Sequence, residues 1–97
     1  MAGSTMQVNI VAADPPVWHG TAKSVTIPAS EGEMGILADH EPVLTVIKGG
    51  TVSVVDPAGE RHAFEVSDGF ISFDFNKLTV AVERGRDVVR TEGPGIE

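Results

Sequence analysis

Alternation of apolar and polar residues constrains the fold of this chain more than any other feature. Met6, Val8 and Ile10 share one parity in the run 6–12. Successive side chains of a β-strand point to opposite faces, so such a run predicts a strand with one buried face. Similar runs occupy 23–29, 51–55, 61–66, 70–75 and 77–83. In the run 70–75, the pattern places Ile71, Phe73 and Phe75 together on the buried face.

Residues that favour turns separate these runs. Gly, Pro, Asn or Asp gather at 13–16, 48–50, 56–60, 67–69 and 76–77. Eight or nine short strands spaced by about 8 to 12 residues are typical of an all-β sandwich or barrel. The segment 42–50 is apolar on both parities, which predicts a strand covered on both faces.

The 97 residues should form one domain with a real core. We expect a β-sandwich domain over 1–84. The alternation is lost after Glu83, and Gly93, Pro94 and Gly95 would stop a helix. Residues 85–97 are therefore predicted to form a short tail, frayed or with one to two helical turns.

Charge and composition argue against several classes of function. The net charge is −7, with 14 acidic residues against 7 basic and no basic tract, which disfavours nucleic acid and anionic membranes as partners. The absence of cysteine excludes thiol chemistry and thiolate metal sites. The N-terminus does not resemble a signal peptide, and no apolar run approaches the ~20 residues of a membrane span. Any membrane contact is expected through another protein.

No pattern predicts a catalytic residue, a metal site or a cofactor. The histidines are His19, His40 and His62, and none belongs to a metal-binding motif. Ser30 is not in a GxSxG turn, and the Gly32–Gly35 pair lacks the spacing of a nucleotide-binding loop. Trp18 precedes strand-like sequence, so a place in the core is favoured over a role as an exposed anchor.

The segment 30–42, SEGEMGILADHEP, is the most unusual one. Glu31 and Glu33 could pair as acid and base, but carboxylates two residues apart in a polar loop are normally solvated. We interpret the segment as a loop, a strand and a second loop. Met34, Ile36 and Leu37 would pack inward, and the charges would be displayed at the two ends, which suits recognition of a partner.

Three stretches together resemble the epsilon subunit of the rotary F-type ATP synthase. They are VNIVAADPPVWHGTAKSVTIPAS (8–30), SEGEMGILADHEPVLTVIKGGTVSV (30–54) and FEVSDGFISFDFNKLTVAVE (64–83). The resemblance implies a flattened β-sandwich of about eight to ten short, mostly antiparallel strands. It also implies a non-catalytic central-stalk subunit, peripheral on the cytoplasmic side of a bacterial membrane, that bridges the gamma subunit and the c ring. Such a subunit couples proton flow to ATP synthesis.

The resemblance also assigns roles within the unusual segment. The loop at Glu31, Gly32 and Glu33 would face the c ring. The turn at His40, Glu41 and Pro42 would face the gamma subunit. Both would act by recognition, without a cofactor.

The chain departs from the family pattern at three places. Ala38 and Asp39 replace a Pro-Gly pair before His40, and Asp68 replaces the first glycine of a Gly-Gly pair. Many family members continue into two C-terminal helices that inhibit hydrolysis and in some cases bind ATP. Only 13 residues follow Arg84, because 97 − 84 = 13, so neither property is expected here.

An alternative interpretation is a small cupin-like or carbohydrate-binding β-domain. It would use His40, His62 and Glu41 around a metal ion or a sugar. Zinc or nickel would then stabilise the fold. Aromatic residues make up only 5% of the chain and tyrosine is absent, which disfavours the sugar.

Overall fold

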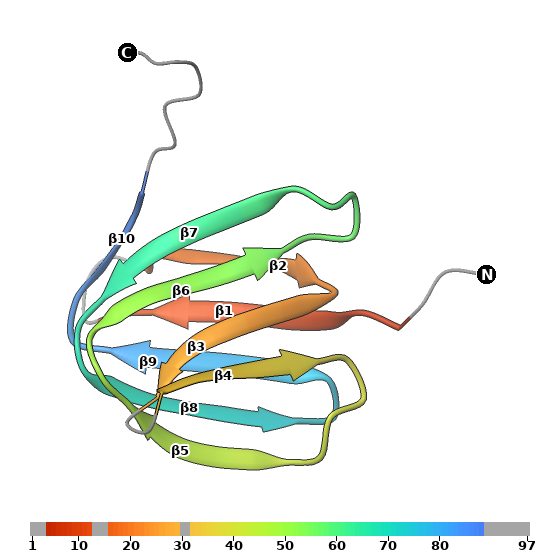
Figure 1. The fold of residues 1–97 in the computed structure, drawn as a ribbon, viewed down its shortest axis with the longest axis horizontal. Helices are drawn as coiled ribbons and strands as arrows, with labels where there is room; N and C mark the ends of the chain where they lie inside the picture. The colour runs from red at the N-terminus through yellow and green to blue at the C-terminus, as the bar shows by residue number, and fades with distance from the viewer. Residues whose placement is uncertain (1–3, 13–15, 30–31, 89–97) are drawn as a thin grey trace, which may run out of the picture.

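The computed structural model describes residues 4–12, 16–29 and 32–88, which form ten strands and no helix (Figure 1). Within these residues there is accordingly no helix with the length and hydropathy of a membrane span. The strands are β1 (Met6–Val11), β2 (Trp18–Ala22), β3 (Ser24–Ala29), β4 (Gly32–Leu37), β5 (Val43–Ile47), β6 (Gly50–Val55), β7 (Arg61–Val66), β8 (Gly69–Asp74), β9 (Lys77–Val82) and β10 (Gly85–Asp87).

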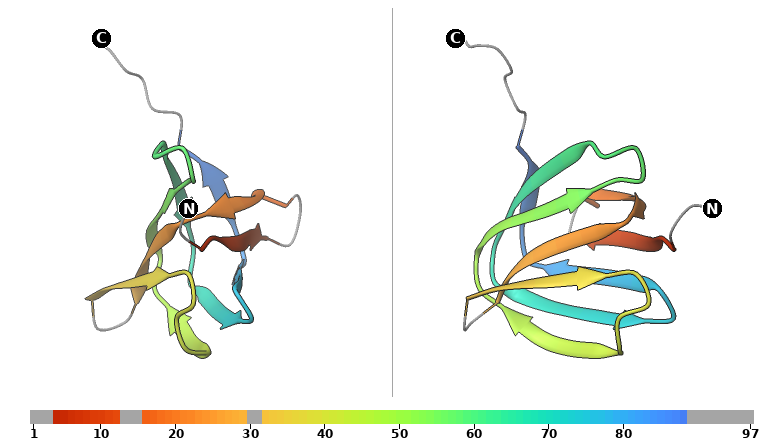
Figure 2. Two further views of the ribbon diagram at one scale, coloured as in Figure 1. Left: turned by 90° about the vertical axis from the view of Figure 1, so that its right-hand side faces the viewer. Right: turned by 45° about the vertical axis from the view of Figure 1, so that its right-hand side comes forward.

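The strands form a sandwich that is nearly closed into a barrel. One half has the order β4-β3-β6-β7-β10, and the other has β5-β8-β9-β1-β2. Figures 1 and 2 show β3, β6 and β7 lying across β1, β8 and β9. The halves are joined at one edge by the pair Ala29 and Ile47. Of the strand pairs described, only β1 and β9 run parallel. The predicted all-β sandwich is confirmed.

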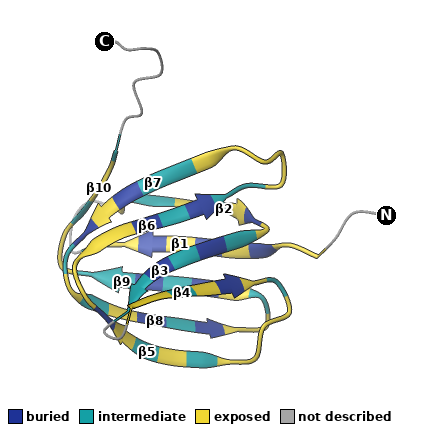
Figure 3. Cartoon of the chain, viewed as in Figure 1, coloured by how far each residue is buried: buried dark blue, intermediate teal, exposed yellow. Residues whose placement is uncertain are grey.

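The apolar residues of the predicted alternating runs form most of the core, and the polar residues between them face outward. In β1 the residues Met6, Val8 and Ile10 are buried, and the residues between them are exposed (Figure 3). Among the described residues no polar or charged side chain is buried. The core is made of Met6, Val8, Ile10, Ala22, Val25, Ile27, Ile36, Ile47, Val52, Val54, Phe64, Val66, Ile71, Phe73, Leu78 and Val80.

Strand β5 is not covered on both faces, so that prediction was wrong. Leu44 and Val46 are 76% and 65% exposed, while Ile47 is fully buried. The described residues form only two layers, so the outer face of β5 has no neighbour within them. The same reason applies to Leu37 at the end of β4, which is 61% exposed although it was expected to pack inward.

Phe75 was also wrongly placed in the core. Strand β8 ends at Asp74, and Phe75 with Asn76 forms a two-residue turn to β9. Both residues have positive φ, 50° and 57°, as a type I′ hairpin turn requires. The turn directs the Phe75 side chain outward, where it is 88% exposed.

The chain continues in the sheet beyond Arg84, where the sequence predicts a tail. Gly85–Asp87 form β10, which pairs antiparallel with β7. This strand has only three residues and no apolar alternation, so the sequence pattern does not reveal it. Residues 89–97 lie outside the described part of the chain.

Candidate functional site

The two segments with predicted partner-binding roles lie at opposite ends of the sandwich. Gly32 and Glu33 begin β4, and the turn 38–42 follows its last residue. Strand β4 has six residues, and a strand rises by about 3.3 Å per residue, so its two ends lie about 20 Å apart. The turn end, at the right of Figure 1, also carries the turns β6–β7 and β8–β9. Glu31 lies outside the described residues.

The opposite end, which we call the Glu33 end, exposes Gly32 and Glu33. Gly32 has φ +119°, a conformation that only glycine adopts without strain. Glu33 pairs in register with Pro28, and within the described residues its carboxylate has no hydrogen-bond partner. Nearby, the N–H of Gly49 donates to Oδ1 of Asp68 at 2.7 Å. This bond gives Asp68 a role that the family's glycine could not fill, and Asp68 is not among the positive-φ residues.

The turn 38–42 is fixed by a reciprocal pair of hydrogen bonds with the β8–β9 turn. The N–H of Asp39 donates to Oδ1 of Asn76 at 2.6 Å, and Nδ2 of Asn76 donates to Oδ1 of Asp39 at 2.9 Å. The bond from Asn76, and a weaker one from Ser4, hold the pKa of the Asp39 carboxyl below its ordinary value. Asp39 has φ 69°, so an aspartate occupies the left-handed conformation at this departure from the family pattern.

This pair of turns presents His40, Glu41 and Pro42 to solvent. Nδ1 of His40 lies 2.8 Å from the carbonyl oxygen of Glu41, and its ring meets Phe73 edge-on at 6.1 Å. The backbone is thus held while the polar side chains remain accessible. The sequence identified Asp39 and Asn76 as turn residues, but it could not predict that they form hydrogen bonds with each other.

An exposed apolar row crosses the outer face of the β5-β8-β9-β1 sheet. Val46 pairs with Phe70, Phe70 with Ala81, and Ala81 with Val11. Val46, Phe70 and Val11 are 65%, 50% and 37% exposed. Leu44 adds to the row on β5, directly after the turn 38–42. The sequence signal for this surface was that the segment 42–50 is apolar on both parities, which we interpreted as a strand covered on both faces.

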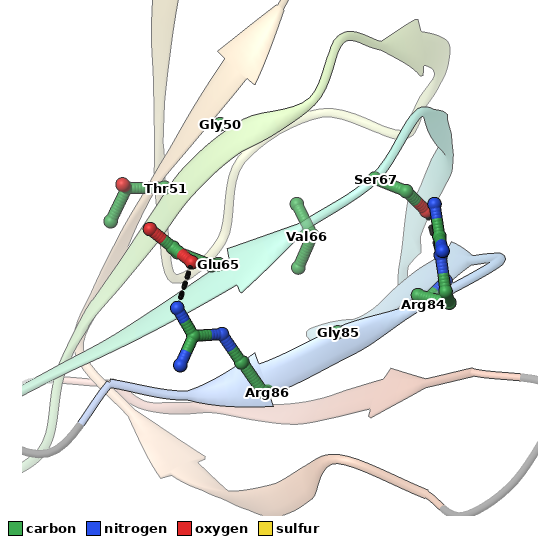
Figure 4. Close-up of a pocket in the computed structure, with 8 residues that line it drawn as sticks. All are labelled: Gly50, Thr51, Glu65, Val66, Ser67, Arg84, Gly85 and Arg86. Atoms are coloured by element: carbon green, nitrogen blue, oxygen red, sulfur yellow. Dashed lines mark hydrogen bonds and ion pairs between the residues drawn. The ribbon is translucent and has the colours of Figure 1, made fainter.

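A hollow with a volume of about 640 Å³ lies beside β7 and β10 (Figure 4). Arg86 Nη2 forms an ion pair with Glu65 Oε1 at 2.6 Å within it. Arg84 and Ser67 line another part, and the N–H of Arg84 donates to the Ser67 hydroxyl at 2.9 Å. Both members of the ion pair are more than half exposed. No residue with a predicted role lines this hollow, and its walls hold no arrangement of base and nucleophile.

In the described part of the chain, His40 and Glu41 do not join His62 in a group of possible metal ligands, so the site of the alternative interpretation is not formed. His62 lies on β7, where Nε2 is 3.0 Å from Oδ2 of Asp56, whereas His40 lies on the β4–β5 turn. Bonds from His62 first, and from the backbone N–H of Glu60, hold the pKa of the Asp56 carboxyl below its ordinary value. Trp18 packs against His62 and Phe64 and borders the core, as the structural interpretation of this residue predicts.

Sequence comparison gives a match over most of the chain. Residues 5–87 match the family described as ATP synthase, Delta/Epsilon chain, beta-sandwich domain. The chain is 41% identical over 88 residues to the ATP synthase epsilon chain of Alkalilimnicola ehrlichii, and 42% identical over 79 residues to that of Rhodococcus erythropolis. These alignments cover 88% and 80% of this chain, but only 63% and 65% of the relatives. The chain thus spans somewhat less than two thirds of the relatives' length.

Two solved structures share the fold. A chain of the Euglena gracilis mitochondrial ATP synthase (OSCP/F1/c-ring) superposes with a TM-score of 0.81 at 20% identity, over 90% of this chain and 56% of that one. A chain of the Tetrahymena thermophila mitochondrial ATP synthase central stalk and c ring gives 0.70 at 14% identity, over 88% and 68%. At these identities the likeness concerns the fold alone.

Proposed function

The chain belongs to the family of ATP synthase delta/epsilon chain β-sandwich domains, and from this we propose that it acts as a non-catalytic subunit of the central stalk. In this role it bridges the gamma subunit and the c ring of a proton-translocating F-type ATP synthase. It couples proton flow to ATP synthesis without a catalytic residue or cofactor of its own. The complex would hold it on the cytoplasmic side of a bacterial membrane, since the sequence relatives are bacterial.

The observation that carries the proposal is the placement of two exposed recognition segments at opposite ends of one rigid body. A bridging subunit must keep its two contacts at a fixed separation while torque acts on it. Here β4 connects them directly, and β3 pairs with β4 along its whole length. The tightly packed interior resists deformation, so the separation is maintained.

We assign the gamma contact to the turn 38–42 together with the apolar row. The Asp39–Asn76 pair holds this turn in one conformation, which lowers the entropy lost on binding. Leu44 and Val46 continue from the turn along β5 and offer the apolar surface that protein interfaces bury at their centre. The exposed row therefore supports a macromolecular partner for this face.

We assign the c-ring contact to the segment Glu31, Gly32 and Glu33. Glu33 is exposed at the start of β4, and its carboxylate would complement the basic or amide groups of a polar loop. Such complementarity fixes register more than it adds affinity. No ATP binding is proposed for this domain.

The test is a calorimetric titration of the folded chain with the purified gamma subunit of the same source. We expect one-to-one binding with a submicromolar Kd. Val46→Glu and His40→Glu should each weaken it at least tenfold, which corresponds to about 1.4 kcal/mol. Thr21→Glu makes a similar change on the far edge strand of the same sheet and should leave the Kd unchanged. Absence of binding, or equal weakening by Thr21→Glu, would contradict the assignment.

A further inference from the structure

The β6–β7 hairpin brings three metal-ligating side chains together, and no role proposed above uses them. Asp56 directly follows β6, Glu60 is the last residue of the turn before β7, and His62 is the second residue of β7. One ligand atom from each lies within 4.8 Å of the other two. In the described ranges this is the only such group of three. We propose that Asp56, Glu60 and His62 bind a divalent transition-metal ion of the zinc type.

The carboxylate of Asp56 is already oriented for this role. Its Oδ1 accepts hydrogen bonds from the backbone N–H groups of Ala58 and Glu60, both at 2.9 Å. Two further backbone bonds of 2.9 Å, from Asp56 N to Glu60 O and from Gly59 N to Asp56 O, close the turn. Among the described residues Oδ2 pairs only with Nε2 of His62, so an ion bound between these two atoms would replace that one bond. The backbone bonds to Oδ1 would then orient the carboxylate, as outer-shell hydrogen bonds to a metal ligand commonly do.

The imidazole of His62 is fixed by packing. Trp18 lies against it with ring centroids 5.5 Å apart and an angle of 32° between the planes. The side chain is 32% exposed, so one edge of the ring reaches solvent. Nε2 faces Oδ2 of Asp56 at 3.0 Å. In the ion-free protein the Nε2–H donates to this oxygen. When the ring proton lies on Nδ1 instead, the Nε2 lone pair points to the place where the ion would lie.

The donor set selects the class of ion. One imidazole nitrogen and two carboxylate oxygens suit zinc and its neighbours in the first transition row, and the open fourth position would hold water. Magnesium and calcium prefer oxygen ligands alone, and no sulfur is available for a soft ion. Bonds of about 2.1 Å place tetrahedral donors about 3.4 Å apart. The exposed Glu60 side chain can swing inward to close the remaining gap.

The consequence for the protein is a cross-link across the turn. An ion would join the end of β6 to the start of β7 and neutralise two of the negative charges of an acidic chain. Because an unfolded chain would not hold the three donors together, binding would favour the folded state. This site is separate from the turn 38–42 and from the apolar row, so it does not depend on the proposed function.

The experiment titrates ZnCl₂ into the full chain without an affinity tag, by calorimetry and by NMR of the histidine rings. We expect one ion per chain, with the His62 resonances shifted and those of His40 unchanged. Glu60→Gln should raise the Kd at least tenfold, and His40→Gln should leave it unchanged. MgCl₂ at the same concentration should not bind.

Glu60→Gln is the decisive variant, because the side chain is exposed and the fold does not depend on it. His62→Gln is the second variant, with folding checked by the dispersion of its amide spectrum. Zinc binding that is absent, that survives Glu60→Gln with the same Kd, or that is lost with His40→Gln would overturn the proposal. The gamma-binding titration reports separately on the proposed function.

Discussion

At the scale of single residues, three residues with left-handed backbone conformations shape the turn end. Asp39, Phe75 and Asn76 all have positive φ, and the Asp39–Asn76 bonds connect the two turns on which they lie. Aspartate and asparagine tolerate this region, whereas a bulky phenylalanine rarely adopts it. The exposed Phe75 is thus kept at a strained position, which is a common feature of functional surfaces.

The Asp39–Asn76 bond predicts how the Asp39 carboxyl titrates. The folded pKa lies below the ordinary value of 3.8, so the bond contributes stability above that pH. This contribution is lost as the pH falls through the lower folded pKa. In a carbon-detected NMR titration we expect a midpoint for Asp39 below 3.8. Asn76→Gly keeps the positive φ but removes the amide, and should return the midpoint toward 3.8. A midpoint that Asn76→Gly does not move would refute this explanation.

Gly69 is required by the close approach of a neighbouring strand. A Cβ at this position would lie 2.0 Å from the carbonyl oxygen of Ala81 and 2.8 Å from Cα of Val82. Because both are backbone atoms, Gly69→Ala should destabilise the fold by about 2 kcal/mol or more in urea unfolding. Gly35→Ala is the matched control: nothing lies within 4 Å of its Cβ, and the change should be neutral or slightly stabilising. Equal effects of the two changes would contradict the structure.

At the scale of strands, periodicity predicted most of the elements and the buried face of strands such as β1, β7 and β9. Met6, Val8 and Ile10 share one parity in the sequence and one buried face in β1. This register is strongly specified, because shifting the strand by one residue would expose all three side chains. Periodicity could not predict what covers the second face of β5, since burial by another protein and burial within the chain leave the same pattern. It also missed β10, whose place depends on the backbone edge that β7 offers.

Strand β8 allows a direct test of the two faces. Phe73 is 1% exposed, and Phe73→Ala should cost about 3 to 5 kcal/mol of unfolding free energy. Phe70, three residues earlier, faces outward and is 50% exposed. Phe70→Ala should cost less than about 1 kcal/mol, yet weaken binding to the gamma subunit. A loss at Phe70 as large as that at Phe73 would show that this face is part of the core rather than a free surface.

At the scale of the whole molecule, the chain is one packed body with distinct ends. Motifs in the right order predicted the family, and the match over residues 5–87 confirms it. The sequence predicted a loop, a strand and a second loop over 30–42, and thus the separation of the Glu33 end from the turn end, but not that the turns β6–β7 and β8–β9 lie at the turn end as well. The separation follows from the extended conformation of β4, which turns neighbours in sequence into opposite poles of the sandwich.

The central claim is that this body couples the c ring to the gamma subunit, and proton pumping tests it most directly. Membrane vesicles carrying an ATP synthase depleted of its epsilon chain would be reconstituted with this chain. ATP-driven acidification would then be measured together with ATP hydrolysis. We predict that the wild-type chain restores pumping and that Glu33→Lys does not, although it still binds gamma. Asp87→Lys, the same charge change on β10, should behave as wild type. Full pumping with Glu33→Lys would contradict the role of the Glu33 end, and full pumping without any added chain would contradict the coupling function itself.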